Sequence, residues 1–250
     1  MRKPAYLIYA IISQLVGLGS LAYFVFWVYR IGVAKTIDSG APGKPIAAFA
    51  VDTVLLAVFC VSHSVLARTS VKRWTRRFVP HPLERATYCL LFGLMLFWLC
   101  FAWRPLPAVV WQVTAPSGIA AIVALFGLCW VVHFASIFWM GYGEFFGLRQ
   151  AWLAARGEEY RPPAPMARRD FAVSHAFLVI SLILIPWATP TMSIGQLYFC
   201  VFLALYDVVG AWLSSRDLSD VPSPVPGFQT APRTAGLASD SDRESPGQAA

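Results

Sequence analysis

The chain has 250 residues, of which 58% are hydrophobic and only 13% are charged, and its mean hydropathy is +0.60. A soluble domain carries about 25% charged residues, so this composition excludes a water-soluble globule, as well as a disordered chain, a collagen and a coiled coil. The net charge of +7 would suggest nucleic acid in a soluble protein, but the basic residues lie in short loops between apolar runs. Membrane topology and lipid headgroups explain them better, so no nucleic-acid partner is expected.

The apolar runs predict an all-α, polytopic transmembrane helical bundle with about six spans and no β-strand domain. The expected spans cover residues 4–29, 46–67, 86–103, 117–140, 171–187 and 194–213. The first begins with basic residues like a signal peptide, but it is too long and lacks a cleavage site, so a retained anchor helix is expected. Residues 1–218 would form the bundle, and the Pro/Ser-rich residues 219–250 a disordered tail.

The distribution of Lys and Arg predicts the orientation in the membrane. The N-terminus, the loops after the second and fourth spans and the tail hold 16 of the 20 basic residues, and the remaining loops hold 4. Because positive charge stays on the cytoplasmic side, both termini and the loops 68–85 and 141–170 should be cytosolic. The sequence thus predicts an integral, multi-pass membrane protein, of the inner or plasma membrane if bacterial, with a cytosolic catalytic face.

Five cysteines lie in or beside apolar runs, with no C-x-x-C spacing. Such cysteines are expected to be buried and unpaired, so neither a disulfide framework nor a metal site is predicted. The cysteines are Cys60, Cys89, Cys100, Cys129 and Cys200.

Ionisable side chains inside the expected spans are functional candidates, because such groups are costly in lipid. A spacing of eleven residues places Asp52 and His63 on one helix face, and the same spacing relates His133 to Glu144. The alternative for each is a polar packing residue bonded to a neighbouring helix. The full set is Asp52, His63, His133, Glu144, His175 and Asp207.

The segment after the fourth span reads GYGEFFG at 141–147, which superficially resembles a glycine-rich nucleotide loop. No strand precedes it and its last glycine is one position late, so a flexible exit from the span is the better interpretation. An apolar stripe beside two arginines then predicts an amphipathic segment at the cytosolic interface. The stripe consists of Phe145, Phe146, Leu148 and Trp152, and the arginines are Arg149 and Arg156.

Histidines in a helical bundle leave a haem-bearing subunit open as an alternative. Bis-histidine ligation needs two rings at matching depth on facing helices, and His63, His133 and His175 are the candidates. No C-x-x-C-H attachment motif is present. A transporter is the other alternative, although no pair of interrupted helices in corresponding halves supports it.

Four patches occur in an order and spacing that carry a family resemblance: HSVLAR at 63–68 with KRW at 72–74, ERATY at 84–88, EFFGLRQAW at 144–152 and WATPTM at 187–192. They are similar to the methanethiol S-methyltransferase family, which is related to NnrU-type membrane proteins and, more distantly, to isoprenylcysteine carboxyl methyltransferases. The resemblance implies an integral membrane enzyme that uses S-adenosylmethionine to methylate methanethiol, giving dimethyl sulfide. It implies a small thiol and the lipid bilayer as partners, with no obligate protein partner.

Methyl transfer from a sulfonium to a thiolate removes two opposite charges, so it is favoured in a dry, apolar pocket. The thiol must lose its proton, and the candidate bases are His175 and His63, since histidine titrates near neutral pH. Glu144 is the candidate for a position against the sulfonium. Arg149 and Arg68 are the candidates for pairing the cofactor's carboxylate.

Two sites depart from the family pattern. A family Arg-His-Pro segment, expected to help hold the cofactor, reads Ser174-His175-Ala176, which keeps only the histidine. The family's paired glutamates appear as Ser214-Ser215, followed by a matching Arg216-Asp217-Leu218. His175 and Asp217 are therefore the cofactor-binding candidates in this half. An inactive or repurposed relative is the alternative function.

Overall fold

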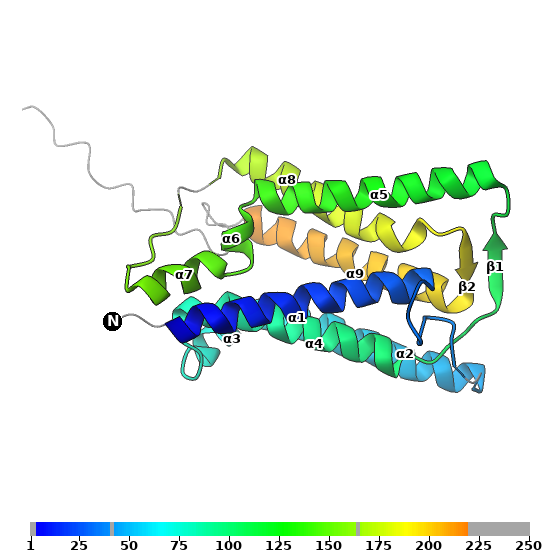
Figure 1. The fold of residues 1–250 in the computed structure, drawn as a ribbon, viewed down its shortest axis with the longest axis horizontal. Coiled ribbons are helices and arrows are strands. Elements are labelled where there is room, and N and C mark those ends of the chain that lie inside the picture. Colours follow the sequence, from blue (N-terminus) through cyan, green and yellow to red (C-terminus); the bar gives the residue numbers. More distant parts are fainter. Residues whose placement is uncertain (1–3, 41–42, 164–165, 220–250) are drawn as a thin grey trace, which may run out of the picture.

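The computed structural model describes residues 4–40, 43–163 and 166–219 and forms an all-α bundle of elongated shape (Figure 1). Five helices are long and apolar enough to cross a membrane, and the described apolar part of a sixth, Ile194–Gly210, is shorter. The fold class is confirmed, while the number of passes and the side of the termini stay predictions. The long helices are α1 Pro4–Tyr29, α2 Pro45–Ala67, α4 Glu84–Ala102, α5 Pro116–Trp139, α8 Arg168–Leu184 and α9 Ile194–Ser219.

The outer surface of the bundle is built for lipid. Only 22% of the best apolar window in α2, and the same share in α5, is buried within the protein. The exposed remainder is apolar, as Val54, Leu128 and Leu205 illustrate with exposed fractions of 61%, 58% and 63%. A surface of this kind is stable in hydrocarbon and not in water, so the helices need a membrane around them.

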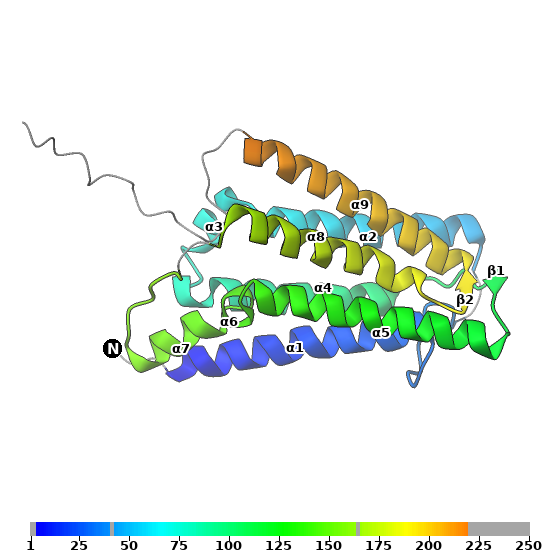
Figure 2. The same ribbon diagram turned by 90° about the horizontal axis from the view of Figure 1, so that it is seen from above.

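Short helices gather at one end of the bundle, which we call the basic end. They are α3 Thr69–Thr75, α6 Tyr142–Phe145 and α7 Leu148–Arg156, and they lie at the end where α1 begins (Figures 1 and 2). Helix α7 packs against α1 and against the short 3-10 helix η1, His81–Leu83. The two basic loops that the sequence placed on one face therefore do lie together.

The other end, which we call the far end, holds two strands that the sequence did not predict. Strand β1, Val109–Gln112, pairs antiparallel with β2, Thr191–Ser193. The second 3-10 helix η2, Ile185–Trp187, lies next to β2. The hydroxyl of Tyr29 shares its one proton between the carbonyl oxygens of Ile185 and Ala188, at 2.6 and 2.8 Å. Strands this short leave no alternating pattern to detect.

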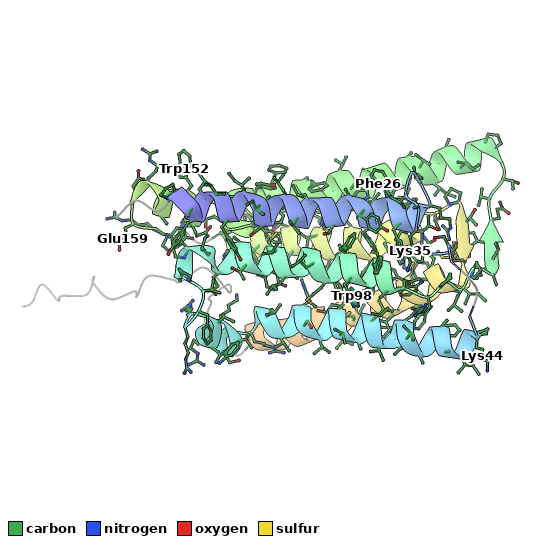
Figure 3. The ribbon with its side chains drawn as sticks, turned by 60° about the horizontal axis from the view of Figure 1, so that its bottom comes forward. Phe26, Lys35, Lys44, Trp98, Trp152 and Glu159 are labelled. Carbon is green, nitrogen blue, oxygen red and sulfur yellow. The ribbon has the colours of Figure 1, made fainter. Side chains whose placement is uncertain are left out.

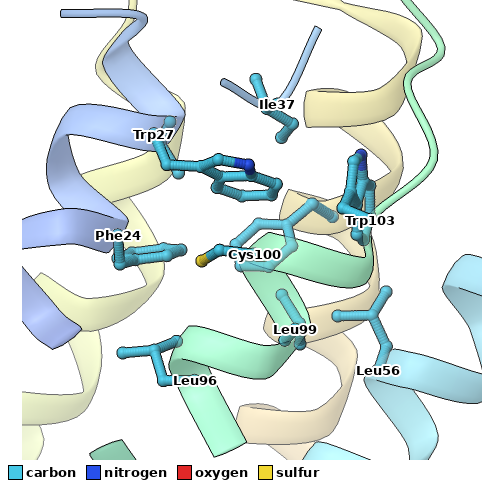
Figure 4. Packing of buried hydrophobic residues seen from close by; sticks show 10 residues of the cluster. Phe24, Trp27, Ile37, Leu56, Leu96, Leu99, Cys100 and Trp103 are labelled. Carbon is cyan, nitrogen blue, oxygen red and sulfur yellow. The ribbon is translucent and has the colours of Figure 1, made fainter. Parts of the chain in front are cut away.

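An aromatic cluster fills the far half of the bundle (Figure 4). The indole rings of Trp27 and Trp103 meet edge to face with centroids 5.6 Å apart. Towards the basic end, α1 and α4 cross closely, because a Cβ on Gly93 would lie 2.9 Å from the Cα of Gly17. Small residues permit this approach between membrane helices. All five cysteines are buried and free, which confirms that expectation.

Candidate functional site

The carboxylate of Glu144 organises the basic end. Its side chain is buried on α6, and both of its oxygens accept hydrogen bonds. Arg149 donates to Oε1 at 2.5 Å, while Gln150 and Tyr160 donate to Oε2 at 2.8 and 2.7 Å. Arg85 at the start of α4 donates to the backbone carbonyl of Glu144 at 2.8 Å. These five residues, the Glu144 cluster, tie segment 144–160 to α4.

Glycines set the backbone that allows this cluster. Helix α5 ends at Trp139, and Gly141 follows with a φ of 92°. Glu144 therefore lies on a separate short helix, and the expectation that it shares a continuous helix face with His133 is wrong. Gly147 has a φ of 81°, and a Cβ there would lie 2.7 Å from the Cβ of Arg85. Only glycine allows the chain to turn this close to α4.

A second polar group joins α2 to α4, one turn along α4 from Arg85: His63 on α2 pairs with Tyr88 on α4. The hydroxyl of Tyr88 lies 2.8 Å from Nδ1 and 3.1 Å from Nε2 of the His63 ring. Tyr88 follows Arg85 by three residues, so one face of α4 reaches both His63 and the Glu144 cluster. The two residues line a narrow crevice whose other walls are apolar: Phe59, Leu66, Phe92 and Met95.

The remaining site candidates lie outside these two groups. His175 is half-buried near the start of α8 and stacks on Phe171 with ring centroids 5.7 Å apart. Arg68 caps the end of α2 with its backbone and has an exposed side chain. Asp217 falls on α9, but its side chain lies outside the described part of the chain.

The polar groups inside the spans mostly have partners in the protein. Nδ1 of His133 lies 3.3 Å from the hydroxyl of Ser181, and an oxygen of Asp52 accepts the backbone N–H of Arg104 at 2.9 Å. The His133 contact joins α5 to α8, as expected of a packing residue, whereas Asp52 binds the segment after α4 and keeps one buried oxygen without a partner among the described residues. Within the described residues, no group of three or more His, Cys, Asp or Glu side chains could hold a metal.

Charge at the basic end is only partly neutralised. Arg76 pairs with Glu84 at 2.9 Å, whereas the guanidinium of Arg68 has no hydrogen bond or ion pair within residues 4–40, 43–163 and 166–219. Burial lowers the pKa of Lys72, and the positive charges of Arg85 and Arg76 act in the same direction. Burial and the hydrogen bond to Glu144 raise the pKa of Tyr160, so its phenol stays a donor.

Sequence reasoning missed the residues that position the candidates. Arg85, Tyr88 and Gln150 lie inside the motif patches, yet none of them was a site candidate. Tyr160 lies outside every patch, and nothing in its local sequence marks it. A polar side chain within a motif, on the same helix face as a candidate, was the available signal.

Several known proteins are similar to this chain over most of its length. The methanethiol S-methyltransferase of Mycobacterium tuberculosis is 38% identical over 218 residues, covering 87% of this chain and 89% of its own. The chain belongs to the methanethiol S-methyltransferase family. The methanethiol S-methyltransferase 2 of Bradyrhizobium diazoefficiens is 36% identical over 86% of this chain and 83% of its own. Mouse Nurim, 29% identical over 69% of each chain, is more distant. No family model and no solved structure matches.

The methanethiol S-methyltransferase motifs divide between the two ends of the bundle. Three of the four patches meet at the basic end, where they supply His63, Arg85, Tyr88 and the Glu144 cluster apart from Tyr160. The fourth, at 187–192, lies at the far end and contributes β2. The basic end is therefore the candidate active site, and the fourth patch belongs to the fold of the far end.

Proposed function

We propose that this protein is a membrane S-methyltransferase that converts methanethiol to dimethyl sulfide with S-adenosylmethionine as methyl donor, at the basic end. The relatives' names supply the reaction. The observation that carries the site is the convergence on α4 of the buried Glu144 cluster and the His63–Tyr88 pair. One helix face thus brings a cation-rich, polar group next to an apolar crevice.

The described residues of the basic end fit such a cofactor. Within them, the buried side-chain oxygen Oε1 of Gln150 has no hydrogen-bond donor, so the protein itself leaves one polar atom of this cluster unsatisfied. The unpaired guanidinium of Arg68 and the half-exposed one of Arg149 suit a carboxylate. When bound, S-adenosylmethionine supplies an electrophilic methyl group on a cationic sulfur. His175 and Asp217 remain proposed binding residues on α8 and α9.

The His63–Tyr88 crevice suits the thiol. Its walls are apolar, but its side chains are packed so closely that no molecule fits between them, so a small apolar thiol enters only when these side chains move apart. His63 accepts the thiol proton, and the Tyr88 hydroxyl orients the imidazole ring. Methyl transfer then neutralises the positive sulfonium and the negative thiolate, and apolar surroundings favour a transition state with less charge than the reactants. Glu144, whose two oxygens already have donors, holds the loop and adds negative charge nearby.

The test is headspace gas chromatography on cells that express the chain and are fed methanethiol, against an empty-vector control. Dimethyl sulfide above the control is expected. His63→Ala should lower the rate at least tenfold, within the range of a lost general base. If His63→Ala keeps the wild-type rate while His175→Ala abolishes the product, His63 is not the base, and His175 acts as the base or in holding the cofactor.

A non-catalytic relative is the second candidate, and one observation favours it. Ser174 occupies the position of the family's arginine, is fully buried and donates a hydrogen bond to the Phe171 carbonyl oxygen at 3.1 Å. No guanidinium is therefore present at this position of α8 to hold a cofactor. Absence of dimethyl sulfide, with the protein verified in the membrane fraction, would favour this candidate.

A further inference from the structure

A cavity of about 360 Å³ opens at the far end, across the bundle from the candidate active site. It lies between the segment after α1 and the residues that follow α4. Its lining contains two cations, Lys35 and Arg104, together with Ser39, Trp103 and Pro105. The volume falls within the range of small-molecule and headgroup sites.

The charges around this cavity are unbalanced. The side chain of Arg104 is exposed and makes no hydrogen bond or ion pair within the described residues, and Lys35 reaches only the backbone carbonyl of Phe101. Burial lowers the pKa of Lys35, the charge of Arg104 lowers it further, and Asp52 acts in the opposite direction. Two cations thus face a single nearby acid. The next acid, Asp38, is already paired with Arg30.

A buried donor also lacks its acceptor at this wall. Trp103 is 1% exposed, and its indole Nε1 has no hydrogen-bond partner among the residues described. In Figure 4 the nitrogen lies on the side of the ring away from Leu99 and Leu56. A buried N–H without an acceptor is unfavourable. The nitrogen is sealed from the cavity in this structure, so an anionic oxygen there meets Lys35 and Arg104 and reaches this N–H only when the indole ring turns.

The surroundings of the cavity are those of a membrane interface. Trp98 and Phe101 on the last turns of α4 are 59% and 56% exposed, and Lys35 lies over the Phe101 ring at 5.5 Å. Figure 3 shows Lys35 and Trp98 along this part of the bundle. Exposed aromatic rings with a nearby cation are typical of the headgroup level, where lipid phosphates lie.

We propose that the far-end cavity is a phosphate-binding site, formed by Lys35 and Arg104, for a phospholipid headgroup or free phosphate. Arg104 supplies two parallel donors to the phosphate oxygens, and Lys35 supplies a point charge. This site is independent of methyl transfer, because it lies at the opposite end from His63 and the Glu144 cluster.

The test is thermal unfolding of the full chain, purified in detergent, with added dioctanoyl phosphatidylglycerol, dioctanoylglycerol or inorganic phosphate. The phosphate-bearing lipid should raise Tm in a saturable way, and the uncharged dioctanoylglycerol should not. Arg104→Gln should raise the half-saturating concentration at least about tenfold. Lys44→Gln, which removes a cation at the same end but outside the cavity, should leave it unchanged.

The outcomes separate the sources of phosphate. A shift with the lipid alone assigns a headgroup, and an equal shift with inorganic phosphate assigns the free anion. No saturable shift with either probe, or an equal response of wild type and Arg104→Gln, would overturn the site. If Arg104→Gln cannot be purified, native mass spectrometry of wild type and Lys35→Gln decides: equal retention of phosphatidylglycerol also overturns it.

Discussion

Glu144 is the residue on which the candidate active site depends most. Three donors converge on its carboxylate, and a carboxamide offers one acceptor oxygen in its place. We expect Glu144→Gln to lower the free energy of unfolding by about 1.5–3 kcal/mol, the value of a hydrogen bond to a charged group. Dimethyl sulfide formation should fall at least tenfold. Thermal unfolding in detergent and a headspace assay measure the two effects.

Glu158 provides the matched control for this substitution. It pairs with Arg156 at 2.8 Å, but both side chains are about half exposed, at 48% and 58%. An exposed pair contributes about 0–1 kcal/mol, so Glu158→Gln should leave both readouts unchanged. Equal losses of stability and activity in Glu144→Gln and Glu158→Gln would show that the Glu144 cluster is no more important than an exposed ion pair.

The phenol of Tyr160 makes the stability of the folded protein depend on pH in the alkaline range. Burial and Glu144 raise its pKa above the ordinary 10.0, so the folded protein holds this proton more tightly than the unfolded chain. The stability that it contributes is present below pH 10 and is lost as the pH rises through the folded pKa. The difference in Tm between wild type and Tyr160→Phe should therefore shrink above pH 10, and a constant difference would contradict this account.

At the scale of elements, the corner between α6 and α7 requires glycine at one position and not at another. A Cβ at Gly147 would meet Arg85 at 2.7 Å on a backbone of positive φ, whereas one at Gly143 would lie 3.7 Å from Arg149. We expect Gly147→Ala to cost about 1–3 kcal/mol and most of the activity. Gly143→Ala should be tolerated, as Tm and methyl transfer would show.

The sequence predicted the long helices far better than the way their ends meet. Residues 4–29 were expected as a span and are α1 without change, and 117–140 differs from α5 by one residue at each end. Such runs are readable because lipid demands continuous apolar helices. The fourth span was expected to end at 140, within one residue of the end of α5, but the short helix α6 and the β1–β2 pair were missed, since tertiary contacts decide both.

At the scale of the whole molecule, the orientation in the membrane is open to a direct test. The five native cysteines are buried, so a cysteine introduced on the surface is the reporter. Lys44→Cys at the far end should react with a membrane-impermeant maleimide in intact cells. Glu159→Cys at the basic end should react only after lysis (Figure 3). The reverse pattern would invert the predicted topology.

The candidate site was predictable in part. Charge counting placed the loops 68–85 and 141–170 on one face, and the structure brings them together through Arg85 and Glu144. Which side chains touch could not be predicted, because contacts such as Tyr160 to Glu144 depend on how a loop folds back on itself. The same limit hid the far-end cavity, whose cations are distant in sequence.

The central claim is that the basic end transfers a methyl group from S-adenosylmethionine to methanethiol. Membranes containing the protein, supplied with methanethiol and S-adenosylmethionine whose methyl group carries three deuterium atoms, test it most directly. Mass spectrometry of the headspace should detect dimethyl sulfide heavier by three mass units, at a rate reduced in Glu144→Gln. Unlabelled product only, or no product from membranes that contain folded protein, would contradict the claim.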